Sequence, residues 1–131
     1  MKKKNLTTTL CALLFLTNSY AQTLTSNGKT VKVQDLPEYI IVNCDNVTSI
    51  LNSSIRIAIQ AKNSKFGTSL QTLEDLLESK NHLKISNQTD LLNTMASLGF
   101  EYVNAFPQNT VPESTFSRAG FVFRKKEKYR N

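Results

Sequence analysis

The clearest pattern along the chain is a strict alternation of apolar and polar side chains over Ser54–Gln60, where isoleucines occupy every second position. A period of two predicts a β-strand with one buried face and one wet face. Such strands are typical of antiparallel sheets that are covered on one side only. Three other segments rich in β-branched and aromatic residues favour strands: Glu38–Cys44, Phe100–Phe106 and Arg118–Lys125.

Leucines at helical spacing predict two helices between the second and third strands. The first is expected to open at Thr68, which has capping-box spacing with Gln71, and to carry Glu74, Asp75 and Glu78 on its solvent side. The second helix is bounded more clearly. Its N-cap is Asn87, and Gly99 occupies the position just after its end.

The order strand, strand, helix, helix, strand, strand predicts an α+β fold. We expect a two-layer sandwich: an antiparallel sheet of about four strands with one or two helices on one face. A single domain is expected over residues 37–126, because the chain is too short for two cores. Residues 22–36 are polar and predict a flexible N-terminal segment, with Thr30–Val33 as an optional short edge strand.

The first 21 residues have the three parts of a secretory signal peptide. Lysines at positions 2–4 precede an apolar stretch over Leu10–Leu16, and small residues, Ser19 and Ala21, precede the expected cleavage point. The apolar stretch is far shorter than the roughly 20 residues that span a bilayer. A lipoprotein anchor at Cys11 is disfavoured, since Leu10 precedes it and the apolar stretch follows it. We therefore expect an exported protein, either periplasmic or extracellular and associated with the outer membrane.

Removal of the leader changes the charge balance. The whole chain has a net charge of +6, but three of those charges are leader lysines. The last eight residues carry five basic side chains and one acid, so the body that remains is slightly acidic. A basic C-terminal tail is expected over residues 127–131. Such a short basic end is weaker evidence for nucleic-acid binding than a basic patch on a folded face, and export argues against a nucleic-acid partner. Contact with an anionic surface stays open as an alternative to a merely solvated chain end.

The segment Leu91–Val103, with Gly99-Phe100-Glu101-Tyr102-Val103 after a Leu-Asn-bearing helix, resembles small exported proteins of the Bacteroidota. In those proteins a helix runs into Gly-Trp-Glu-Phe-Val and a final strand ends in Lys-Lys or Arg-Lys, as Phe123–Lys126 does here. Phe100 replaces the usual tryptophan. The resemblance implies an α+β fold and an envelope location. It implies no activity and no functional residue.

A catalytic constellation is not visible in the sequence. After cleavage Cys44 is the single thiol, and its place in an alternating strand favours a buried side chain, with an intermolecular disulfide or a reactive nucleophile as the alternatives. The single histidine, His82, lies in a polar turn, and a pair with Cys44 is not required by the spacing. One histidine and scattered acids predict no metal site, and scattered glycines predict no phosphate loop or cofactor site.

The sequence therefore favours a non-catalytic, exported interaction module of a bacterial cell envelope that binds a protein partner. The alternatives are an accessory subunit of a larger outer-membrane complex and a small periplasmic hydrolase with an unrecognised site. The aromatic residues of the last third of the chain are expected either in the core or in a patch beside the basic end. The candidate partner-binding residues are Phe116, Phe121, Arg124, Lys125, Lys126, Lys128 and Arg130.

Overall fold

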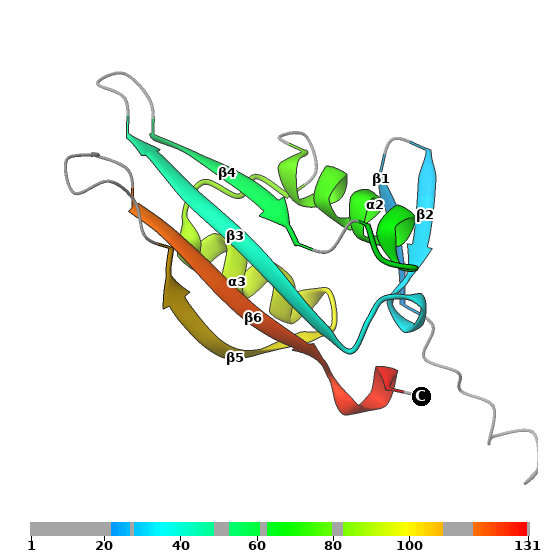
Figure 1. The fold of residues 1–131 in the computed structure, drawn as a ribbon. Helices are drawn as coiled ribbons and strands as arrows, with labels where there is room; N and C mark the ends of the chain where they lie inside the picture. The colour runs from blue at the N-terminus through cyan, green and yellow to red at the C-terminus, as the bar shows by residue number, and fades with distance from the viewer. Residues whose placement is uncertain are drawn as a thin grey trace, which may run out of the picture.

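The computed structural model describes residues 22–26, 28–48, 53–60, 63–79, 83–108 and 117–130. The fold is α+β, with a four-stranded antiparallel sheet, a second sheet of two strands, and two α-helices (Figure 1). In chain order the elements are β1 (Thr23–Ser26), β2 (Lys29–Lys32), η1 (Val33–Asp35), β3 (Tyr39–Thr48), β4 (Ser53–Ile59), α2 (Gly67–Glu78), α3 (Gln88–Ser97), β5 (Phe100–Pro107), β6 (Ser117–Lys125) and η2 (Glu127–Tyr129).

The large sheet has the strand order β4-β3-β6-β5, so the first and last predicted strands are its two central members. Every neighbouring pair is antiparallel, as the alternating pattern predicts. Strand β3 is longer than predicted. It continues through Thr48, because the residues after Cys44 pair with β4 on one side and, as far as Asn46, with β6 on the other.

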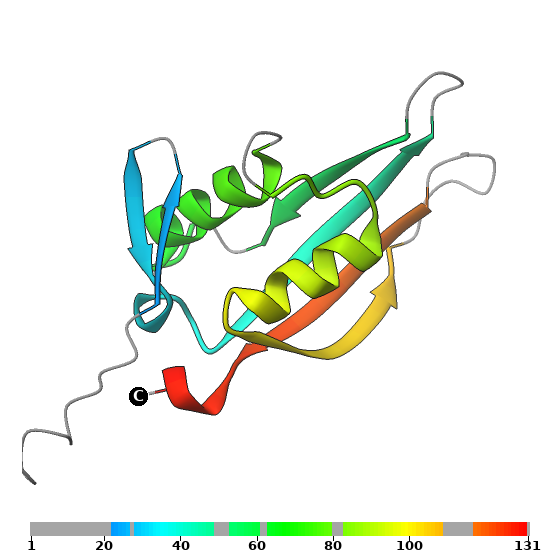
Figure 2. The same ribbon diagram turned by 180° about the vertical axis from the view of Figure 1, so that it is seen from behind.

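Both helices lie on the same side of this sheet, which leaves its other face uncovered by them (Figures 1 and 2). In the view of Figure 1, helix α3 lies behind the sheet, where it contacts β5, whereas α2 lies between β4 and the β1–β2 hairpin. The two-layer arrangement is therefore the predicted one, with the small hairpin sheet as an addition.

The helix boundaries test two capping predictions with opposite results. The Asn87 cap is confirmed, since its Oδ1 accepts the Asp90 N–H at 2.9 Å, and Gly99 follows the helix with a φ of +102°. The capping box at Thr68 is wrong. Helix α2 begins at Gly67 without a side-chain cap, and the Gln71 amide instead donates to Asp75 Oδ1 at 3.0 Å.

The core lies between the sheet and the helices. The period-two prediction for β4 is confirmed, because Ile57 and Ile59 are buried while Arg56 and Ala58 are exposed. The buried apolar side chains form one continuous cluster. Its largest fully buried members are Phe100, Phe123, Leu36, Leu70, Leu73, Leu77, Leu91 and Met95.

The flexible N-terminal segment predicted over residues 22–36 is wrong. This segment forms the β1–β2 hairpin and the η1 turn, and it buries Leu24, Val31, Val33 and Leu36 in the common core. The reason is that α2 contacts the hairpin as well as β4, so the buried side chains of the helix are covered from both. The packed unit consequently starts well before residue 37.

The basic C-terminal tail predicted over residues 127–131 is also wrong as far as it is described. Residues 127–129 form the η2 turn, which folds back and buries Tyr129. The Tyr129 hydroxyl donates to Gln22 Oε1 at 2.7 Å, and the Gln22 amide donates to the Ser97 carbonyl at 3.1 Å. The two ends of the described chain therefore meet beside the end of α3.

Candidate docking face

The side of the four-stranded sheet that neither helix covers is hereafter called the open face. Strand alternation and register assign its residues, because paired residues share a face. Its described members are Tyr39, Ile41, Asn43 and Asp45 on β3, Arg56 and Ala58 on β4, Glu101, Asn104 and Phe106 on β5, and Arg118, Gly120, Val122 and Arg124 on β6.

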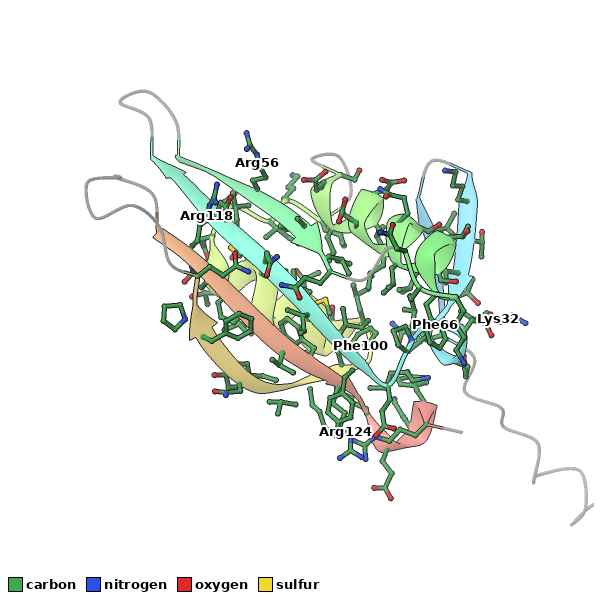
Figure 3. The ribbon with its side chains drawn as sticks, in the orientation of Figure 1. Lys32, Arg56, Phe66, Phe100, Arg118 and Arg124 are labelled. Carbon is green, nitrogen blue, oxygen red and sulfur yellow. The ribbon has the colours of Figure 1, made fainter. Side chains whose placement is uncertain are left out.

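One end of the open face holds a carboxylate between two arginines. Asp45 pairs in register with Arg118 on β6 and with Arg56 on β4. The Arg118 Nε lies 3.1 Å from Asp45 Oδ2, and about half of the Arg118 side chain stays exposed. Figure 3 shows Arg56 and Arg118 toward one end of the sheet and Arg124 toward the other.

The opposite end holds a second set of ion pairs. Arg124 Nη2 lies 2.6 Å from Glu38 Oε1, and its guanidinium stands 5.2 Å from the centre of the Tyr39 ring. The hydrogen bond to Glu38 raises the pKa of Arg124 above its ordinary value. Arg130 pairs with Glu101 from the folded C-terminal turn. The charges at this end therefore compensate each other.

The middle of the open face is apolar and amide-bearing. Ile41 and Val122 are adjacent in register and half-buried. The Phe106 ring lies over Gly120, where a Cβ would collide with the tip of the ring. Asn43 Oδ1 accepts hydrogen bonds from the side-chain amides of Gln60 and Gln108. The centre of the open face is thus lined by apolar side chains, an aromatic ring and side-chain amides rather than by charges.

The structure separates the residues predicted to bind a partner. Phe121 and Lys125 cannot belong to a surface patch, because they are 6% and 4% exposed. Both point to the helix side of β6, in register with buried neighbours, and the Lys125 ammonium donates to the Gln34 carbonyl at 3.0 Å. Burial lowers the pKa of Lys125.

The remaining predicted residues fall in different places. Arg124 lies on the open face, and Arg130 lies beside it. Lys126 donates to the Ala96 carbonyl at 2.6 Å, at the end of α3, and Lys128 stands over the Tyr129 ring at 4.9 Å. Phe116 lies outside the described residues. Of the described aromatic residues in the last third of the chain, Phe121 and Phe123 lie in the core, whereas Tyr102 is 54% exposed and Phe106 lies on the open face.

Sequence reasoning did not include Tyr39, Asp45, Arg56 or Arg118 among the candidate partner-binding residues. The signal was present in the alternation of each strand, which marks these positions as outward. What the sequence lacked was the strand order, which brings β3 and β6 side by side and so places Asp45 against Arg118.

The thiol of Cys44 is fully buried between β3 and α3, as predicted, and it is free. Desolvation by burial, followed by the charge of Asp45, raises the pKa of Cys44 from its ordinary 9.0 to about 11, against a hydrogen bond from Gln88 that lowers it. A raised pKa leaves little thiolate at neutral pH, so the thiol is a poor nucleophile. His82, the other half of the conceivable pair, lies outside the described residues.

Because the pKa of the buried Cys44 thiol is raised, we expect the protein to lose stability at alkaline pH. The unfolded chain releases the proton near pH 9.0 and the folded chain near pH 11, so the folded state binds more protons between these values and the free energy of unfolding falls as pH rises. At about 1.4 kcal/mol per pKa unit, the loss approaches about 2–3 kcal/mol. Urea unfolding at pH 8, 9, 10 and 11 measures it. A Cys44→Ala variant supplies the baseline, and equal slopes for both proteins would contradict the assignment.

Glu74 differs from its prediction, because it is 7% exposed rather than solvated. Its Oε2 accepts the Ile59 N–H at 2.6 Å, on the outer edge of β4. The carboxylate therefore satisfies a backbone donor that a sheet edge would otherwise leave unpaired. The prediction failed because α2 packs against β4, which the helical pattern alone does not specify.

Among the described residues, no three His, Cys, Asp or Glu side chains are grouped to hold a metal ion.

A shallow, open depression of about 420 Å³ lies at the start of α2. Its lining combines two lysines with small polar side chains: Lys29, Ser64, Lys65, Gly67, Thr68 and Gln71. This lining contains no histidine, thiol or carboxylate that could act as a general base. Its openness also contrasts with the buried clefts that hold small substrates.

Within the described ranges, no helix is long and apolar enough to cross a membrane. No protein-family model, curated protein or solved structure matches the chain.

Proposed function

We propose that the protein is an exported, non-catalytic interaction module of a bacterial cell envelope that binds a protein partner through the open face. The single observation that carries the proposal is a broad sheet face that neither helix covers (Figures 1 and 2). The export signal over residues 1–21 supports the location.

The composition of the open face supports a protein partner. All four arginines of the chain lie on this face or beside it, and none of its described members is a lysine. Tyr39 is 53% exposed on the same surface. Arginine and aromatic residues are enriched in the cores of protein interfaces, whereas lysine is depleted there. A face that contacts only solvent gains nothing from having arginine and tyrosine in place of lysine.

The shape of the molecule supports docking over catalysis. Hydrolysis of a small substrate needs a cleft in which a nucleophile, a base and an orienting group converge. The depression beside α2 has an open shape, and its lining has no histidine, thiol or carboxylate. A broad sheet face with half-buried apolar side chains at its centre suits contact with another protein.

Photo-crosslinking in the native envelope tests this proposal. A photoreactive benzoyl-phenylalanine replaces Ala58, an exposed residue of the open face on β4, in cells that produce the protein. We expect irradiation to yield a discrete crosslinked species, which mass spectrometry then identifies.

The matched control places the same photoreactive residue at Asn93, an exposed position of α3 on the other side of the molecule. We expect no discrete adduct there. Equal adducts at both positions, or none at Ala58, would show that the open face is not a docking surface.

A further inference from the structure

The two central strands of the open face carry charges of opposite sign, next to Arg56 on β4 and Glu101 on β5. Strand β3 contributes Asp45 and is preceded by Glu38, whereas β6 contributes Arg118 and Arg124. Each carboxylate pairs across the strands with the arginine beside it. One central strand is therefore acidic on this face and its neighbour is basic.

This division makes the open face complementary to itself. A two-fold axis parallel to the strands, midway between β3 and β6, would place β3 of one copy on β6 of the other. The acidic strand β3 of each copy then faces the basic strand β6 of the other. An isologous contact requires such a self-complementary surface. The same operation keeps the strands of the two sheets nearly aligned, as in sheet-on-sheet packing.

We propose that the open face is covered by a second copy of this chain, in a two-fold dimer that stacks the two four-stranded sheets. The inference rests on the proposed function, because it names the partner of the same docking face. At the centre, Ile41 of each copy lies against Val122 of the other, since the two residues are partners in register. At one end, Asp45 and Arg118 of the two copies form a ring of alternating charges.

The exposed arginines have unused hydrogen-bonding capacity. A guanidinium has five N–H donors, and a single carboxylate engages two of them at most. Arg118 remains 48% exposed and Arg124 remains 35% exposed while paired with their own carboxylates. A second carboxylate from the facing copy can therefore bind without breaking the pair within the chain.

The area of the open face limits how much surface the contact can bury. Four strands about 4.8 Å apart, each with about eight residues rising about 3.3 Å, span roughly 500 Å². Stable complexes bury about 800 Å² on each partner. We therefore expect a weak dimer with a Kd on the order of micromolar to tens of micromolar. High salt weakens it, because its ends are ionic.

Analytical ultracentrifugation of the purified protein over a wide concentration range tests the dimer. We expect reversible dimerisation, and Arg118→Asp to raise the Kd at least tenfold, because it sets two carboxylates against each other in each copy and between copies. Asp45→Arg acts in the same way. The double variant, Asp45→Arg with Arg118→Asp, exchanges the two charges of this pair and is expected to restore the dimer.

A matched control is Lys32→Asp, which makes the same change in net charge on β2, away from the open face. It is expected to leave the Kd unchanged. A monomer at every concentration, a dimer that Arg118→Asp does not weaken, or a double variant that folds but stays monomeric would each overturn the inference. A monomeric protein whose Ala58 position still crosslinks to a different protein would refute the dimer and leave the proposed function standing.

Discussion

Replacing Leu36 by alanine is expected to lower the free energy of unfolding by about 2–5 kcal/mol, the usual cost of truncating a buried leucine. Leu36 is 1% exposed and belongs to the same apolar cluster as α2 and the sheet. The substitution therefore removes apolar contacts and leaves a cavity, although it lies in a segment whose sequence is mostly polar. Urea unfolding followed by circular dichroism measures the change.

The matched control is Lys32→Ala, four residues earlier and exposed on β2. Surface substitutions of this kind usually change stability by less than about 0.5 kcal/mol. If residues 22–36 were a flexible lead-in, Leu36→Ala would be as neutral as this control. The comparison thus separates a packed hairpin from a mobile one.

Gly99→Ala is the second substitution with a large expected effect. The φ of Gly99 is +102°, where side chains are strained, and a Cβ would lie 2.5 Å and 2.9 Å from two atoms of the Tyr129 ring. The backbone strain costs about 1–3 kcal/mol. Displacement of a packed ring costs a further 1–3 kcal/mol or so. We expect the free energy of unfolding to fall by the combined amount in urea titrations.

Gly28→Ala separates the cost of backbone strain from the cost of displacing the Tyr129 ring. Gly28 also has a positive φ, of +75°, but a Cβ there would meet nothing within 4 Å. Its cost is expected to be the backbone contribution alone, about 1–2 kcal/mol. Gly99→Ala in a Tyr129→Ala background should approach the same small value relative to that background. Equal effects of Gly28→Ala and Gly99→Ala would show that Tyr129 does not pack against Gly99.

Much of the fold follows from local patterns. The alternation over β4, the cap at Asn87 and the glycine after α3 each report a preference of a few neighbouring residues, and the structure confirms all three. The errors concern residues whose surroundings come from distant segments. Leu24, Glu74 and Tyr129 are buried by elements far away in the chain, which no local period reveals.

The open face, too, could be predicted only in part from the sequence. The sequence identifies Arg124 and Arg130 as exposed basic residues near the end of the chain, and these two do lie at the open face. It could not distinguish them from Lys125, since all belong to one basic run. The pleat of β6 turns Lys125 toward the helices, and burial of its stem beside Phe100 follows from the register with β5.

By itself, the sequence determined the types and the order of the two helices and of the four strands of the large sheet, and which residues of β4 face inward, because these depend on the spacing of apolar side chains along a short stretch. Only the tertiary structure decided the strand order, the cover that the N-terminal hairpin gives to α2, and the return of the C-terminus to Gly99. Those features depend on contacts between segments that are far apart in the chain. The open face was also decided by the tertiary structure, since Asp45 lies beside Arg118 only because β3 pairs with β6.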